Sequence, residues 1–167
     1  MTNFKKVMFA AIFAAFSLLT STVNAQTTEE KIEVYELISE YSYMWDAQNI
    51  DGLLNLFTDE CSWDWYRNDG KEEVLCENKE QLRAHAEKMM KTKLLTRHFQ
   101  TNTIILEYKS GMIKTRTMLL GNYLFEKKRR KGFFNKSKSI FQGIYEDEFV
   151  KTAEGWKFKN RKLVTDN

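Results

Sequence analysis

The hydrophobic pattern of the chain changes from a helical spacing in its first half to a strand-like spacing in its second half. Apolar residues recur every three or four positions from Val34 to Trp45, which predicts an amphipathic helix over about residues 27–47. The same spacing predicts a short helix at 51–57 and a third helix at 78–91. The first part of the domain is therefore expected to be helical.

Strand-like segments separated by glycine-containing turns follow the helices. One earlier strand is expected at 61–66, and the later ones at 95–106, 112–126, 139–151 and 156–164. Helices followed by strands are typical of an α+β fold, and strands of this length imply a curved sheet. We therefore expect a cone-like, curved antiparallel β-sheet with three N-terminal-side helices packed on its concave face. The open end of such a cone would form the mouth of a pocket.

Residues 1–25 have the character of a signal peptide. Two lysines precede an apolar run at 7–19, and Val23 and Ala25 occupy the small-residue positions of a cleavage site. The run is shorter than the roughly 20 apolar residues that a membrane span requires. We expect cleavage, a periplasmic or secreted location and one mature domain at 26–167. An uncleaved anchor or a buried first helix is the alternative.

Composition is that of a globular protein: of 167 residues, 43% are hydrophobic and 29% are charged. Seven glycines and no proline exclude a collagen-like or proline-linker chain. Cleavage after residue 25 removes two lysines and no acidic residue, so the net charge falls from +3 to +1. The overall charge favours no particular partner, and export argues against nucleic acid.

Residues 127–138 differ from the rest of the chain in charge, with seven basic side chains and no acidic one around Gly132-Phe133-Phe134. One interpretation is an arm that makes weak contact with anionic components of the cell envelope. The other is a solvated hairpin loop whose two phenylalanines pack on a neighbouring subunit.

Two cysteines are too few for a disulfide-rich scaffold or, alone, for a four-ligand zinc site, and two histidines leave little room for a multi-histidine metal site. In an oxidising compartment Cys61 and Cys76 would form a disulfide; otherwise they are buried free thiols. His85 lies in a strongly charged predicted helix and is expected to be solvated. His85 and His98 with scattered carboxylates do not build a metal triad, so we expect neither a metal nor a cofactor.

Four short motifs resemble a known family in their content and their order. They lie at 41–59, 95–102, 143–147 and 155–161, and they contain D-x4-D, RH-x3-N, G-x-Y-x-D and GW-x-F-x2-R, respectively. Together they resemble the SnoaL-like branch of the nuclear transport factor 2-like superfamily. The resemblance implies the cone-shaped fold and a homodimer. It leaves the function open, because the superfamily includes dehydratases, isomerases, polyketide cyclases, dioxygenase β-subunits and proteins without catalytic activity.

Scytalone-dehydratase-like relatives carry an acid–base pair at the positions that His98 and Asp46 occupy here. The resemblance implies that His98 removes a proton α to a carbonyl and assists the departure of a hydroxyl, while Asp46 orients it. The alternative is structural: Asp46 ends a helix and His98 joins a strand network. Asn122 replaces the relatives' second histidine and Tyr145 replaces an asparagine, so the complete dehydratase machinery is absent.

Aromatic side chains are the predicted wall of the pocket, and they suit a small hydrophobic or ring-bearing molecule. The candidate ligand contacts are Tyr41, Trp45, Trp65, Tyr123, Tyr145, Asn102, Arg116 and Asn122. The alternative for each ring is an ordinary place in the core. Arg161 is expected to form a surface or structural ion pair.

Two hypotheses follow. The chain is a cofactor-independent lyase or isomerase that uses the pair Asp46 and His98 on a small ring-bearing substrate. Alternatively, it is a non-catalytic module of the same fold that binds a hydrophobic ligand or another protein.

Overall fold

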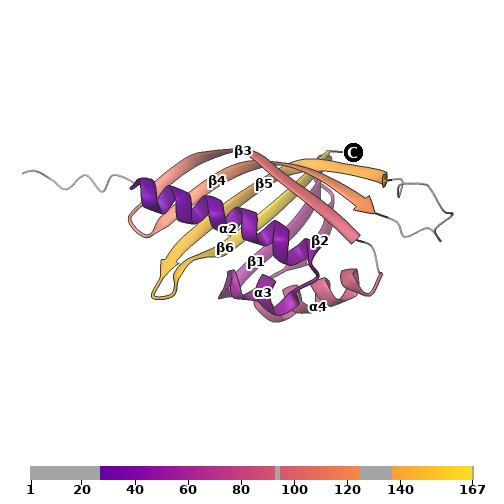
Figure 1. Cartoon of the computed structure of the whole chain (residues 1–167), viewed down its shortest axis with the longest axis horizontal. Helices are drawn as coiled ribbons and strands as arrows, with labels where there is room; N and C mark the ends of the chain where they lie inside the picture. The colour runs from indigo at the N-terminus through magenta and orange to yellow at the C-terminus, as the bar shows by residue number, and fades with distance from the viewer. Residues whose placement is uncertain (1–26, 93–94, 125–136, 167) are drawn as a thin grey trace, which may run out of the picture.

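The computed structural model describes residues 27–92, 95–124 and 137–166, which form three helices and one six-stranded sheet (Figure 1). The helices are α2 (Thr28–Asp46), α3 (Ile50–Asn55) and α4 (Lys79–Met90). The strands are β1 (Phe57–Arg67), β2 (Glu72–Cys76), β3 (Leu95–Lys109), β4 (Met112–Leu124), β5 (Ser137–Thr152) and β6 (Gly155–Asp166). This arrangement confirms the predicted α+β fold with a curved sheet and three helices.

The six strands follow the order β2-β1-β6-β5-β4-β3. Neighbouring strands are antiparallel except β1 and β6, which run parallel. The prediction of a purely antiparallel sheet is therefore wrong for this one pair. Consecutive strands joined by short turns must be antiparallel, whereas β1 and β6 come from the two ends of the domain and carry no such restriction. Strand β2, which the sequence analysis did not predict, pairs with β1 at the edge of the sheet.

Helix α2 lies along the concave side of the sheet, while α3 and α4 gather at one end beside β1 and β2 (Figure 1). Thr27 begins α2 with a capping box, in which Glu30 N–H donates to the Thr27 hydroxyl and Thr27 N–H donates to the Glu30 carboxylate. Asn49 caps α3, and Asn78 caps α4. The helices therefore begin where side-chain oxygens satisfy their first backbone N–H groups.

Phe57 belongs to β1, not to the short helix in which the sequence analysis placed it. Its ring stacks on Phe158 of β6, with 5.0 Å between ring centroids, and Phe158 in turn packs on Phe149 of β5. All three rings are almost completely buried. Burial of this aromatic group between the helices and the sheet outweighs the helical spacing of the preceding leucines.

Arg161 of β6 lies in the core with no exposed surface, opposite Asp147 in the register of β5 and β6. Its Nε is 3.4 Å from the Asp147 carboxylate, and its guanidinium lies 3.8 Å from the Tyr41 ring centroid and 3.6 Å from that of Tyr145. Arg161 Nη2 also donates to the Gln100 side-chain oxygen. The arginine thus forms a structural pair, but in the core and not at the surface.

The outer face of β3 and β4 exposes several large apolar side chains. They alternate with inward-facing residues along both strands, as the two-residue period of a sheet requires. They are Leu95, Phe99, Ile104, Leu106, Met118 and Leu120, each at least 43% exposed. This face has no cover among the described residues.

Cys61 and Cys76 are buried free thiols in the structure, so the disulfide that the sequence left open is not formed. Burial raises the pKa of Cys76 to about 11, which keeps this thiol protonated. The signal-peptide prediction, and the 127–136 part of the basic segment, lie outside the described residues. Within the described ranges, no helix has the length and hydrophobicity needed to cross a membrane.

Stability should depend on pH through Asp147, because burial raises the pKa of its carboxyl group to about 6. An unfolded aspartate has a pKa of about 3.9, so the folded state binds this proton more tightly. Asp147 therefore adds stability below about pH 4, and that stability is lost as the pH rises through about 6. Between pH 4 and pH 7, the free energy of unfolding of the wild type should therefore fall by up to about 3 kcal/mol relative to that of Asp147→Asn.

Urea unfolding of both proteins across this pH range measures the difference. Asp69→Asn, at an exposed turn, is the control and should follow the wild type. Parallel stability curves for the wild type and Asp147→Asn would contradict the assignment.

Candidate functional site: an aromatic pocket with two histidines

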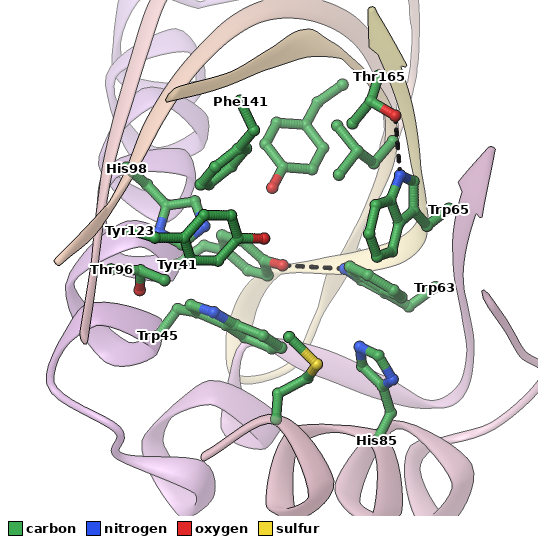
Figure 2. A pocket seen from close by; sticks show the side chains of 13 residues that line it. Tyr41, Trp45, Trp63, Trp65, His85, Thr96, His98, Tyr123, Phe141 and Thr165 are labelled. Carbon is green, nitrogen blue, oxygen red and sulfur yellow. Dashed lines mark hydrogen bonds between the residues drawn. The ribbon is translucent and has the colours of Figure 1, made fainter. Parts of the chain in front are cut away.

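A narrow pocket of about 60 Å³ opens between α2, α4 and the concave face of the sheet (Figure 2). Its wall is mainly aromatic, and the rings come from α2, β1, β4 and β5. They are Tyr41, Trp45, Trp63, Trp65, Tyr123, Phe141 and Tyr145. A cavity of roughly 150 Å³ holds one benzene ring, so a ring-bearing ligand requires these side chains to move and enlarge the pocket.

Two of the indoles already use their N–H groups within the protein (Figure 2). Trp63 donates to the Tyr41 hydroxyl at 2.9 Å, and Trp65 donates to the Thr165 hydroxyl at 3.0 Å. Trp45 and Trp63 stack nearly parallel, with an interplanar angle of 7°. The wall therefore presents rigid, flat carbon surfaces to the pocket.

Asp46, the last residue of α2, holds the ring and the backbone of His98 in β3. Its carboxylate is 2.6 Å from His98 Nδ1, and it accepts hydrogen bonds from His98 N–H at 2.9 Å and the Thr96 hydroxyl at 2.8 Å. The side chains are largely buried, with 13% of Asp46 and 6% of His98 exposed. The end of α2 and the start of β3 are thus tied together at this carboxylate.

The hydrogen bonds also determine the charge of Asp46. Burial alone would raise the pKa of its carboxyl group, but the bonds from His98 and Thr96 lower it below the usual value. Asp46 is therefore ionised at neutral pH, and a carboxylate can only accept hydrogen bonds. His98 must carry a proton on Nδ1, which leaves Nε2 as the ring nitrogen that can accept a proton from a ligand.

Alternate residues of β3 face α2 and fix the helix against the sheet. Beyond Thr96 and His98, the amide nitrogen of Gln100 donates to the Ile38 carbonyl at 2.9 Å and to the Ser42 hydroxyl at 2.6 Å. The side chains of Asp46 and His98 therefore lie on two regular elements that are hydrogen-bonded at several points, a support that favours precise positioning.

A second hollow of about 270 Å³ lies on the other side of the Asp46 and His98 pair, between α2 and β3. Its lining is more polar and includes Ser39, Ser42 and Gln100 as well as the pair itself. The pair thus separates an aromatic compartment from a polar one. Water in the polar hollow would provide a route for proton exchange with solvent.

His85 of α4 lines the aromatic pocket, contrary to the expectation that it would be solvated. Its ring stacks on Trp63, with centroids 5.0 Å apart, and on Trp45 at 6.2 Å. Burial, together with the nearby Lys88, lowers the pKa of His85 below its usual value. His85 is therefore neutral at pH 7.

Four of the predicted ligand contacts, Tyr41, Trp45, Trp65 and Tyr145, line the pocket together with His98. Tyr123, the fifth predicted ring, lines it as well, and Asp46 lies behind His98.

Asn102, Arg116 and Asn122 do not line this pocket, so these three assignments are wrong. Asn102 forms a bulge with a positive φ of 53°, and its exposed side chain donates to Met118. Arg116 pairs with Glu146 at 2.7 Å on the outer face. Asn122 lies opposite the exposed Arg97, at a position of β4 that faces outward. Strand alternation places all three away from the concave side.

Sequence reasoning did not assign His85, Phe141 or Trp63 to the pocket. A signal for His85 was present: it follows Leu82 by three residues and precedes Met89 by four, so it lies on the apolar stripe of α4. Phe141 carried no comparable signal, because its neighbours in β5 are of mixed polarity.

The sequence model of the SnoaL-like domain family matches residues 26–162, which is most of the chain. The chain belongs to this family. No curated protein sequence matches it. The family resemblance expected from the four motifs is therefore confirmed.

Solved structures with a similar architecture carry different descriptions. A scytalone dehydratase-like protein from Novosphingobium aromaticivorans is 23% identical, with a TM-score of 0.65 over 83% of this chain and 88% of that one. The β subunit of benzoate 1,2-dioxygenase from Burkholderia mallei is 12% identical, with a TM-score of 0.64 over 79% and 87%. An NTF2-like protein with a cystatin-like fold, also from N. aromaticivorans, is 16% identical, with a TM-score of 0.60 over 92% and 86%. At these identities the similarity shows the fold alone.

Replacing Asp46 with alanine should release the His98 ring in this SnoaL-like domain. In the wild type, neutral His98 should carry its proton almost entirely on Nδ1, because the ionised carboxylate accepts it there. Asp46→Ala should show a mixture with the Nε2 tautomer and should cost about 1–3 kcal/mol, because buried donors lose their acceptor. Nitrogen-15 NMR of the imidazole measures the tautomer, and urea unfolding measures the stability.

Asp51→Ala is the control, because it removes an exposed carboxylate that pairs with Arg83. It should change neither the His98 tautomer nor the stability much. An unchanged His98 tautomer in Asp46→Ala would show that Asp46 does not orient the ring.

Proposed function

We propose that this protein binds a small ring-bearing carbonyl compound in the aromatic pocket and catalyses proton transfer without a cofactor, as an isomerase or lyase. The observation that carries the proposal is the 2.6 Å contact between Asp46 and His98 Nδ1 at the wall of this pocket. Exported location, as the sequence predicts for residues 1–25, is part of the same proposal.

The chemistry follows from the protonation of the pair. His98 Nε2 removes a proton from the carbon α to the substrate carbonyl, and the electron pair of the C–H bond forms an enolate. The ionised Asp46 stabilises the imidazolium that results. Return of the proton to another carbon completes an isomerisation, and departure of a β-hydroxyl as water completes a dehydration.

The narrow, flat-walled pocket favours a ligand with one planar or nearly planar ring. Rings of Trp45 and Trp63 offer stacking surfaces, while the two imidazoles are the titratable nitrogen groups of the described lining. A scytalone dehydratase-like protein is among the structures with this fold, and dehydration is a lyase reaction of the proposed kind. The alternative is a pocket that only binds its ligand, without proton transfer. The following test distinguishes this alternative from catalysis.

Wild-type protein should accelerate hydrogen–deuterium exchange at the α carbons of cyclohexanone in D₂O, because His98 can remove those protons. His98→Gln should lower the protein-dependent rate 100-fold or more, the usual contribution of a general base. Proton NMR follows the loss of the α-hydrogen signal. Thr101→Ala, on the exposed part of β3, is the matched control and should keep the wild-type rate.

Equal rates in the wild type and His98→Gln, or no acceleration by the wild type, would contradict the proposed catalysis. Retained binding of cyclohexanone in that case would support the non-catalytic alternative.

We also propose that the exposed apolar face of β3 and β4 meets a second copy of this chain. A cluster of exposed apolar side chains of this kind is unusual on a monomer. The same face carries the ion pair of Arg116 and Glu146, so it offers both signs of charge. Two identical patches that meet about a two-fold axis must be self-complementary, and a patch with both signs of charge can pair with its own copy.

Leu120→Glu should shift the protein from dimer to monomer, because it places a charge in the centre of the apolar face opposite Phe99. Sedimentation velocity measures the change. Ile32→Glu, at an equally exposed apolar position on α2, is the control and should remain dimeric. A monomeric wild type at micromolar concentration would overturn this proposal.

A further inference from the structure

His85 lies across the pocket from His98, on a different element of the fold (Figure 2). His98 belongs to β3 and lies beside the end of α2, whereas His85 belongs to α4. The ring of Trp45 contacts both imidazoles, and that of Trp63 contacts His85. Both histidines line the same cavity. The only histidines of this chain therefore face one enclosed space.

Trp45 contacts both imidazoles and so defines how far apart they are. Its ring meets the edge of His98 at a centroid distance of 6.3 Å and stacks with His85 at 6.2 Å. A ligand ring that lies against this indole would therefore reach toward both histidines at once.

The two imidazoles differ in their surroundings. His98 is held by an ionised carboxylate, whereas His85 contacts aromatic rings and has no hydrogen-bond partner within the described ranges. The charged group that acts on His85 is Lys88 on its own helix, and together with burial it keeps the imidazole neutral. A neutral imidazole retains one N–H, which is an available donor in a pocket where the indole N–H groups of Trp63 and Trp65 are already bonded.

We propose that His85 is a second catalytic residue, which donates a hydrogen bond from its ring N–H to the carbonyl oxygen of the substrate. This inference rests on the proposed function. When His98 Nε2 takes the α proton, the electrons of the C–H bond move into the enolate and its oxygen becomes negative. The His85 N–H stabilises that oxygen, and His98 returns the proton to carbon in the next step. No other reactant is consumed.

The role assigned to His85 is distinct from a role in packing. A phenyl ring at position 85 can stack on Trp63 as the imidazole does, but it has no N–H. A glutamine at position 85 loses the stacking and keeps an N–H donor. The pair His85→Phe and His85→Gln therefore separates hydrogen bonding from packing.

Binding measurements test the hydrogen bond without relying on catalysis. Cyclohexanone and cyclohexane share a ring and differ in the carbonyl oxygen. His85→Phe should weaken cyclohexanone binding about fivefold, the effect of one lost hydrogen bond, and should leave cyclohexane binding unchanged. Ligand-induced shifts in two-dimensional NMR spectra give both dissociation constants and show that each variant is folded.

An equal change for the two ligands, or no change for either, would overturn the inference. Absence of binding by both ligands to the wild type would overturn it together with the proposed pocket. His85→Gln should bind cyclohexanone more tightly than His85→Phe does, and the reverse order would also count against the N–H donor.

Exchange of the cyclohexanone α hydrogens then tests the catalytic role. His85→Phe should lower the protein-dependent rate at least tenfold, and His85→Gln should recover part of it. A wild-type rate in His85→Phe, with loss of activity in His98→Gln, would reject the role of His85 and retain the proposed function. No acceleration by the wild type would reject the proposed function and this catalytic role together, whereas the binding measurements would still judge the hydrogen bond.

Discussion

Arg161 carries its charge in the interior of the cone, and the elements around it are arranged to compensate for that charge. An unpaired charge in a protein core is costly, so its neighbours must be in place when the fold forms. Asp147 supplies a carboxyl group, Gln100 an amide oxygen, and Tyr41 and Tyr145 the faces of their rings. Because the two tyrosines also line the pocket, the position of the pocket depends on this buried cation.

Most of the fold could be predicted from local signals. Helices α2 and α4 have an apolar spacing of three and four with capping residues at their starts, and the last four strands are separated by short turns. The parallel pairing of β1 with β6 had no such signal, because it joins Trp63 to Arg161 across nearly the whole domain. Phe57 was assigned to a helix from the local pattern alone. Its long-range contact with Phe158 outweighs that pattern in the folded chain.

The site was less predictable because it depends on the phase of each strand. Tyr145 faces the pocket, as expected, whereas Arg116 and Asn122 lie on outward positions of β4. On β3 the bulge at Asn102 changes the phase within one strand, and the sequence offers little warning of it. His85 was assigned to solvent on the charge of its neighbours, although its spacing on α4 placed it inward.

The bonded indole N–H groups of Trp63 and Trp65 limit what kind of molecule the pocket accepts. These two indoles can offer contact area but no new donors, so polar groups of a ligand that lie against them would lose water and gain nothing in return. Sugars and other polyhydroxylated rings should be rejected on that ground alone. Selectivity for molecules with an apolar perimeter and one oxygen at the end would thus arise from hydrogen bonds that the protein makes with itself.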